Sequence, residues 1–396
     1  MHQSSEVDVS HCSPASGGPD KPAGPPFPAG RRSPLAGVAR VGRLLLTTVL
    51  MAVGLAGSAS GADTPFVRSS SGRLVLQGVP FLFTGMNLWN ANANLGPPQY
   101  CGSPAGLSAA GDEFGPGVRA VRLWFFQRLA TTPEGMRDWS AFDATVHAAA
   151  AHNLRIIAVL GNQWADCEGY ASAADGYRTR DWYRDGYRRN RPPGQPDTYR
   201  DWVRAVVERY RDDPTIMMWQ LVNEPEDADS LGGSCSPDAA EVLRAFTRDV
   251  GRQVKDLDAR HLLGMGTTGS GQCGTSGGDY VQLNADPSID VADYHDYALD
   301  VLPGDQWNGL ATRAHEMVQL GKPLIIGEMG VVPDQVGGFQ QRASLITSKL
   351  HADYELGVQG ALLWAWRPAS AGGSSSAGYD IGPGDPVLDR LAALAP

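Results

Sequence analysis

Residues 215–225 read Thr-Ile-Met-Met-Trp-Gln-Leu-Val-Asn-Glu-Pro, a short apolar run that ends abruptly in a carboxylate. Its length and the closing Pro225 indicate a buried β-strand that delivers Glu224 to its C-terminal end. In parallel α/β barrels, active sites lie at that end of the strands. The same residues also fit an ordinary glutamate in the first turn of a helix, so the rest of the chain decides between the two.

Similar apolar runs recur along the chain, separated by segments with helical periodicity. The predicted strands lie at 80–87, 118–125, 154–160, 215–225, 261–265, 289–297, 323–328 and 360–366. The predicted helices lie at about 133–153, 198–211, 236–256, 310–320, 338–356 and 386–394. A short β-hairpin is expected near 66–76. Strands alternating with helices in this number predict a single-domain α/β fold, the (β/α)8 TIM barrel.

The composition is that of a large globular protein. The chain has 396 residues, of which 42% are hydrophobic and 19% charged, enough for a sizeable core. Its net charge of −10 argues against a nucleic-acid partner and against docking to an anionic membrane surface. Ten Trp and twelve Tyr are many, and aromatic faces often hold sugar rings, although such residues also fill cores. A neutral substrate fits this balance.

Residues 1–62 are interpreted as an N-terminal extension with a signal peptide. Basic residues up to Arg43 precede the apolar stretch 44–57, and small residues offer cleavage near Ala62. A membrane anchor is disfavoured because a span needs about 20 predominantly apolar residues. An Arg-Arg pair far upstream leaves both the general and the twin-arginine export routes open. We therefore expect a secreted domain, 63–396, with no membrane attachment after cleavage.

Export would leave four of the five cysteines in an oxidising compartment. None of them shows the Cys-x-x-Cys spacing of a metal site. We expect the disulfides Cys101–Cys167 and Cys235–Cys273, because the barrel would place each pair on loops at the same face. Free buried thiols are the alternative.

The longest predicted insertion, 161–197, follows the third strand. Its aromatic residues Trp164, Tyr170, Tyr177, Trp182, Tyr183 and Tyr187 are interleaved with arginines. Such a segment could form an aromatic and basic lid over a binding cleft. It could equally be a helical insertion that packs its own aromatic side chains.

Two glutamates end predicted strands that lie far apart in the sequence. Glu224 closes the fourth strand and Glu328 the seventh, so a barrel would place their carboxylates across its mouth. Hydrolysis of a glycosidic bond needs such a pair, because one carboxyl group protonates the leaving oxygen while the other attacks the anomeric carbon or activates water. We therefore expect both to be catalytic.

Other polar and aromatic residues fall at the same ends of predicted strands. Arg122 could hold a carboxylate in its ionised form. His295 and Tyr297 are two apart on one strand and so point to the same side. Trp364 could form a hydrophobic floor. Each has a purely structural alternative as an ion pair, a core histidine or packing, but their shared location favours catalysis.

The motifs, in chain order, are Gly85-Met86-Asn87, Val121-Arg122-Leu123-Trp124, Asn223-Glu224-Pro225, His295-x-Tyr297 and Ile326-Gly327-Glu328-Met329-Gly330. Together they resemble glycoside hydrolase family 5, of the large clan of retaining (β/α)8 barrels. The resemblance runs from about residue 66 to the C-terminus. Within the family, 66–87 and 210–225 are similar to endo-β-1,4-mannanases.

The resemblance implies a role for each motif residue. Glu224 would be the general acid/base, Glu328 the nucleophile, and Asn223 a hydrogen-bond partner of the sugar 2-hydroxyl. Retention of configuration implies carboxyl groups about 5 Å apart, against a wider gap for inversion. The implied supporting residues are Arg122 and Tyr297 against the nucleophile, His295 in the catalytic subsite and Trp364 as a stacking surface.

Three residues depart from the mannanase pattern and bear on the sugar more than on the chemistry. Gln220 stands where mannanases often carry Glu, Gly327 where many have a second Glu, and Met329 where Phe is usual. We expect endo-β-1,4-mannanase activity. The alternatives are a cellulase or β-glucanase and an exo-acting galactofuranosidase or arabinofuranosidase on the same barrel.

Two other classes of protein fit less well. A non-catalytic carbohydrate-binding barrel would keep the aromatic residues but lose the acids, and both glutamates are present. A metal-dependent hydrolase would need several His and Asp ligands at strand ends, where only His295 qualifies because His261 begins its strand. We therefore expect no metal and no cofactor, a polysaccharide or oligosaccharide as the partner, and a monomer.

Overall fold

The computed structural model describes residues 64–92, 101 and 106–394, within a compact unit that spans Ser58–Pro396. Its parallel strands are β4 (Phe83–Asn87), β5 (Ala120–Trp124), β6 (Arg155–Val159), β7 (Ile216–Gln220), β8 (Leu262–Gly264), β9 (Ala292–Asp296), β10 (Leu324–Met329) and β11 (Gly360–Leu363). They form one eight-stranded sheet in the order β8-β7-β6-β5-β4-β11-β10-β9. A parallel bridge between Gly264 and Val291 joins the outer strands β8 and β9, which closes the barrel. The (β/α)8 fold is thereby confirmed.

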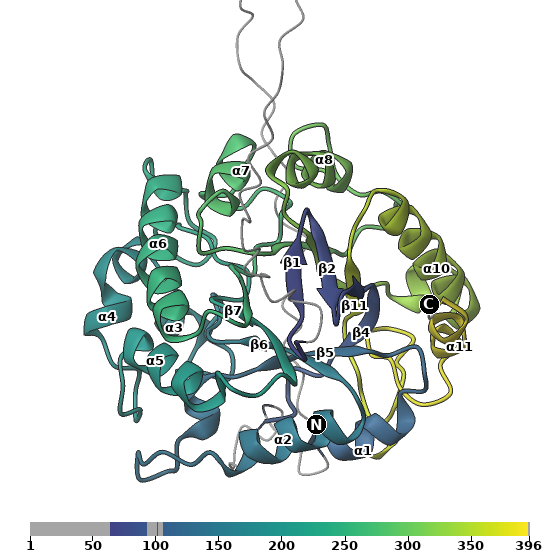
Figure 1. Cartoon of the computed structure of the whole chain (residues 1–396), viewed down its shortest axis with the longest axis horizontal. Coiled ribbons are helices and arrows are strands. Elements are labelled where there is room, and N and C mark those ends of the chain that lie inside the picture. The colour runs from purple at the N-terminus through teal and green to yellow at the C-terminus, as the bar shows by residue number, and fades with distance from the viewer. Residues whose placement is uncertain (1–63, 93–100, 102–105, 395–396) are drawn as a thin grey trace, which may run out of the picture. The chain divides into compact units, whose positions relative to one another are not determined.

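The helices lie outside the strands, as Figure 1 shows. The longer ones are α1 (Gly106–Glu113), α2 (Ser140–Ala151), α5 (Tyr199–Tyr210), α6 (Ala239–Leu257), α7 (Gly278–Asn284), α8 (Leu310–Leu320), α10 (Phe339–Glu355) and α11 (Pro386–Leu394). The short helices are α3 (Ala173–Gly176), α4 (Tyr187–Arg189) and α9 (Pro333–Val336). In α6, Val242, Phe246 and Val250 recur every four residues and are buried, as expected of a helix that packs one face on a sheet.

The predicted N-terminal hairpin is present and covers one end of the barrel. It comprises β1 (Arg68–Ser70), β2 (Arg73–Leu76) and the short β3 (Val79–Pro80), paired antiparallel. Val67 and Leu74 belong to a buried cluster with residues from the barrel strands, among them Ile157 and Leu362. The apolar side of the hairpin therefore closes the barrel at its N-terminal end (Figure 1).

Two predicted helix starts were wrong by several residues. The helix expected from residue 133 begins at Ser140, because Thr131 instead pairs with Arg137 in an antiparallel bridge. The helix expected to start with Ser236 begins at Ala239. The Ser236 hydroxyl donates to Asp227 instead of capping the helix.

Both expected disulfides are formed. Cys101 bonds to Cys167 and joins the loops after β4 and β6. Cys235 bonds to Cys273 and joins the loops after β7 and β8. Both bonds therefore lie at the C-terminal ends of the strands.

The expected signal peptide, 1–62, lies outside the described residues. Among the helices in the described ranges, none is long and apolar enough to cross a bilayer.

Candidate active site

Glu224 lies four residues beyond β7, at the mouth of the barrel. Its backbone has φ +53°, in the left-handed region that non-glycine residues seldom adopt. The Glu224 amide donates to the Gly266 carbonyl at 2.8 Å, and the Gln272 side chain donates to the Glu224 carbonyl at 3.2 Å. Gly266 itself has φ +90°, and a Cβ there would lie 2.2 Å from the Val222 oxygen. Close contact between two loops thus fixes the turn that carries Glu224.

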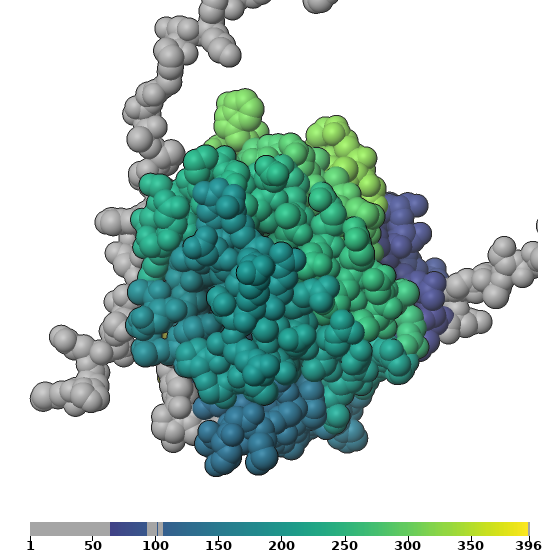
Figure 2. Space-filling view, turned by 90° about the vertical axis from the view of Figure 1, so that its left-hand side faces the viewer, coloured from purple at the N-terminus to yellow at the C-terminus, as the bar shows by residue number. Residues whose placement is uncertain are grey.

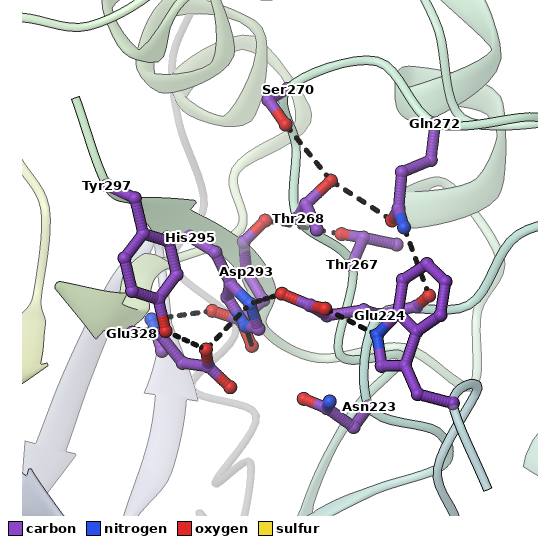
Figure 3. A network of polar contacts seen from close by, with 12 residues as sticks. Asn223, Glu224, Thr267, Thr268, Ser270, Gln272, Asp293, His295, Tyr297 and Glu328 are labelled. Atoms are coloured by element: carbon purple, nitrogen blue, oxygen red, sulfur yellow. Dashed lines mark hydrogen bonds and ion pairs between the residues drawn. The ribbon is translucent and has the colours of Figure 1, made fainter. Parts of the chain in front are cut away.

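The carboxylate of Glu224 accepts hydrogen bonds at both oxygens (Figure 3). Trp164 Nε1 lies 2.6 Å from Oε2, and His295 Nδ1 lies 2.7 Å from Oε1. Burial raises the pKa of Glu224, but the contacts with His295 and Trp164 outweigh it and hold that pKa below its ordinary value. In this arrangement Glu224 is ionised, because donors occupy both of its oxygens.

Glu328 lies near the end of β10 and is buried. Arg122 donates to its Oε1 at 2.6 Å, and the Tyr297 hydroxyl donates to its Oε2 at 2.5 Å. Burial raises the pKa of Glu328 above its ordinary value, against the opposing effect of His295 and Arg122. The carboxylate is thus desolvated and held in one orientation, as a nucleophile requires.

The two glutamates face one another at short range. One carboxylate oxygen of each and a ring nitrogen of His295 all lie within 4.8 Å of one another. Carboxyl groups about 5–5.5 Å apart are typical of retaining glycosidases, whereas inverting ones need about 6.5–9.5 Å to admit a water. Three such groups could also approach a cation. Here the guanidinium of Arg122 already neutralises Glu328, which favours an acid–base cluster over a set of metal ligands.

Arg122 connects four strands at the mouth. Its side chain is fully buried and makes four hydrogen bonds. Besides Glu328, the acceptors are Gln220 Oε1 at 2.7 Å, Asn223 Oδ1 at 2.6 Å and Asn87 Oδ1 at 3.2 Å. The planar fork of an arginine suits this because it presents several donors in fixed directions.

His295, on β9, lies between three carboxylates. Its Nδ1 is 2.7 Å from Glu224 and 3.5 Å from Glu328, and its Nε2 is 3.6 Å from Asp293 Oδ2. Burial lowers the pKa of His295, but Glu328, Asp293 and Glu224 raise it to about 10. The ring is therefore an imidazolium at neutral pH.

Two aromatic residues border this cluster. Tyr297 donates to Glu328, and its ring packs edge-on against Tyr379 at 5.1 Å between centroids. Trp364 follows β11 and is half-buried, with its ring 5.9 Å from that of Trp124. Trp364 is thus partly exposed beside the end of β11.

The insertion 161–197 mostly packs its own aromatic side chains, as one of its two predicted forms has it. Tyr177, Tyr183 and Tyr187 are buried, and Arg178 lies 3.9 Å from the Trp182 ring centroid, so most of the segment packs on itself and on α6. Figure 2 shows this teal face of the molecule as a continuous surface. Trp164 differs, since it hydrogen-bonds to Glu224.

The structure brings the residues expected from the sequence together around the two glutamates. Sequence reasoning missed Trp164, Asn87, Gln220 and Asp293 as members of this network. For Asp293 a signal existed, because it lies two residues before His295 on a strand and must share its side.

Comparisons with known proteins identify the family of this chain. The family model described as Cellulase (glycosyl hydrolase family 5) matches residues 78–370. Mannan endo-1,4-beta-mannosidase 8 of Oryza sativa subsp. japonica is 27% identical over 363 residues, which cover 77% of this chain and 92% of that protein. The probable mannan endo-1,4-beta-mannosidase A-2 of Aspergillus terreus is 27% identical over 251 residues, 55% of this chain and 60% of that protein.

The fold also matches solved structures. The endo-1,4-beta-mannanase from Rhizomucor miehei superposes with a TM-score of 0.64 at 20% identity, covering 83% of this chain and 99% of that chain. At this identity the likeness supports the barrel itself. With the family model matched across most of the barrel, the chain belongs to glycosyl hydrolase family 5 and is a glycoside hydrolase.

Proposed function

We propose that this chain is a secreted, retaining endo-β-1,4-mannanase whose catalytic domain is 63–396. The observation that carries the mechanism is the short separation of Glu224 and Glu328, with carboxylate oxygens within 4.8 Å and different partners on each. The choice of mannan as the substrate rests on the relatives, whose names describe mannan endo-1,4-beta-mannosidases. The family match over residues 78–370 supports one catalytic domain, and the relatives' names support a polysaccharide substrate.

In the first step, Glu328 attacks the anomeric carbon and forms a glycosyl ester. The bond from that carbon to the glycosidic oxygen breaks, and Glu224, which must first be protonated, delivers its proton to this oxygen. Arg122 and Tyr297 orient Glu328 for the attack through the bonds already described. Asn223 Oδ1 accepts from Arg122, and Asn223 Nδ2 donates one hydrogen to Asn162. The second Nδ2 hydrogen remains for the sugar 2-hydroxyl.

In the second step, Glu224 accepts a proton from water while the water oxygen attacks the same carbon. The ester bond breaks and its electron pair returns to Glu328 as a carboxylate. Two inversions at one carbon give a product of unchanged anomeric configuration.

The test is hydrolysis of β-mannan, glucomannan, cellulose, β-glucan and furanoside substrates, followed by anomeric NMR on whichever is cut. We expect β-mannan to be cut internally, with a β-configured first product. An α-configured first product would contradict the retaining mechanism, and a preference for another polymer would move the substrate to one of the alternatives. N-terminal sequencing of protein secreted from the native host should begin near residue 63.

Variants of the two glutamates test their roles. Glu328→Gln should abolish turnover because the amide is a poor nucleophile, and Glu224→Gln should slow it severely because no proton is available. Asp334→Asn, at an exposed site in α9, serves as a matched acid-to-amide control that should keep activity. Near-normal turnover by either glutamate variant would reject the assignment.

A further inference from the structure

Asp293, on β9, lies beneath the two catalytic glutamates and carries no role in the steps above. It is 2% exposed. Its Oδ1 accepts the Gly327 amide at 2.8 Å, and its Oδ2 accepts Gln220 Nε2 at 2.5 Å. Both oxygens of this buried side chain thus face hydrogen-bond donors.

Gly327 makes room for this carboxylate. A Cβ at Gly327 would lie 2.5 Å from Asp293 Oδ1 and 2.6 Å from Oδ2, closer than side chains approach. The pairing of β10 with β9 shifts register here, from Ile326 opposite Tyr294 to Glu328 opposite His295, so Gly327 is the extra residue of a bulge. Glycine is required at Gly327 for space, and the acid at position 293 fills that space.

Gln220 fixes the direction of the contact. Its Oε1 accepts from Arg122 Nε at 2.7 Å, and because arginine has only donors this end of the amide cannot be reversed. The Nε2 end must therefore donate, and it does so to Asp293 Oδ2. A buried chain of polar contacts thus runs from Arg122 through Gln220 to Asp293.

His295 lies beside the Asp293 end of this chain of contacts. Its Nε2 lies 3.6 Å from Asp293 Oδ2 and has no hydrogen-bond partner among the described residues. We propose that Asp293 is a positioning residue that holds His295 as an imidazolium, with Nδ1 toward Glu224, so that His295 stores the proton that Glu224 delivers. The proposal rests on the proposed glycosidase mechanism only for its consequence in catalysis.

The proton transfer balances within the cluster. The Nδ1–H bond of His295 breaks, an Oε1–H bond forms on Glu224, and both groups become neutral before Glu224 protonates the glycosidic oxygen. The groups that face His295 are Glu224 from the β7 end, Glu328 from β10 and Asp293 from its own strand, with Arg122 behind Glu328. These carboxylates outweigh burial and raise the pKa of His295, so the proton is present at neutral pH.

The first test is Asp293→Asn, which removes the charge and keeps the shape. The pair of His295 and Glu224 titrates as a unit, and the alkaline limb of the pH profile of kcat/KM reports the loss of its proton. Without the carboxylate at position 293, that limb should move to lower pH by roughly 1–3 units. In the substrate-free enzyme, NMR titration of ring-labelled His295 should show the same downward move.

A double variant separates charge at this position from hydrogen bonding alone. In Gln220→Glu/Asp293→Asn, the side-chain amide introduced at position 293 can accept from the Gly327 backbone amide. It can also donate to the carboxylate introduced at position 220, so the buried contacts are restored. The charge at position 220, however, is held against the Arg122 guanidinium, which neutralises it. We expect the lower pH limb to persist in this variant, and a profile restored to that of the parent enzyme would overturn the proposal.

Two more variants complete the test. Gly327→Ala, which must displace the Asp293 carboxylate, should move the His295 titration in the same direction. Asp258→Asn alters an equally buried acid next to a histidine, His261 at 2.5 Å, at the other end of the barrel. It should lower thermal stability and leave the pH profile in place.

The NMR titration does not depend on which sugar is cut. An unchanged titration of His295 in Asp293→Asn would refute the proposal even in an active enzyme. A lowered titration would support it even if the mannanase assignment failed.

Discussion

Asp353, in α10, is a buried acid without a hydrogen-bond partner. It is 0% exposed, and neither carboxylate oxygen has a partner among the described residues. Burial and the nearby Asp296 raise the pKa of Asp353 to about 8, against the opposing effect of Lys349. The folded chain therefore binds a proton here that the unfolded chain, with an ordinary pKa near 3.8, releases at much lower pH.

This difference in pKa between the folded and unfolded chain makes the stability depend on pH. Because the folded pKa is the higher one, the parent chain keeps this part of its stability below about pH 4 and loses it progressively up to about pH 8. The difference between about 8 and 3.8 corresponds to an upper bound of roughly 5–6 kcal/mol, at about 1.36 kcal/mol per pKa unit. Asp353→Asn removes the titration, so the variant should match the parent at pH 4 and exceed it by several kcal/mol at pH 8.

The assay is thermal melting of the disulfide-intact protein at pH 4, 6 and 8. Comparing the variant with the parent at each pH isolates this group from all others that titrate. For a chain of this size, several kcal/mol correspond to an increase in Tm of roughly 5 °C or more.

A matched substitution should act in the opposite direction. Asp385, also buried, pairs with Arg342 of α10 and accepts from Ser374. Asp385→Asn removes the negative charge that faces the buried Arg342 guanidinium, which still donates to the Asp380 carbonyl, and should destabilise by up to about 3 kcal/mol at neutral pH. Equal pH dependence of Tm in the parent and in Asp353→Asn, or a lower Tm for that variant at pH 8, would refute the reasoning.

Two further predictions concern the mouth of the barrel. Trp164→Phe removes the donor to Glu224 Oε2, so the pKa of Glu224 should rise and the alkaline limb of kcat/KM should move to higher pH, which steady-state assays across pH would show. An unmoved limb would mean that the indole contributes packing alone. Replacing Cys235 and Cys273 by Ser together opens a cross-link with a sequence separation of 38, and should cost about 4 kcal/mol by loop entropy, measured as a lower Tm. After reduction the variant and the parent should melt at the same temperature, because neither then holds a disulfide, and an oxidised variant with the Tm of the oxidised parent would contradict the estimate.

The barrel and the placement of Glu224 and Glu328 at its mouth were predictable from the sequence because they depend on periodicity. Strands such as β6 and β7 are largely apolar because both of their faces are covered, and polar residues such as Glu224 follow shortly after their ends. Since parallel strands of a barrel share one C-terminal end, Glu224 and Glu328 had to lie at the same mouth. No knowledge of side-chain packing was needed for this.

Other features depend on tertiary contacts that leave no periodic pattern in the sequence. Trp164 lies in a long insertion, and its direction follows from loop packing against Glu224. The contact of Asp293 depends on the bulge at Gly327, which sequence alone does not locate. The predicted start of the helix at Ser236 was wrong for the same reason, because the hydrogen bond from Ser236 to Asp227 is a tertiary contact.

The two disulfides have a consequence for how this enzyme can change. They tie loops that follow β4, β6, β7 and β8, the half of the mouth that carries Glu224 and Trp164. The loops after β9 to β11 have no such cross-link within the described residues, and one of them exposes Leu299 and Trp307 to solvent. Substitutions in these loops should therefore shift the backbone more easily than substitutions in the half that holds Glu224, which the two disulfides brace.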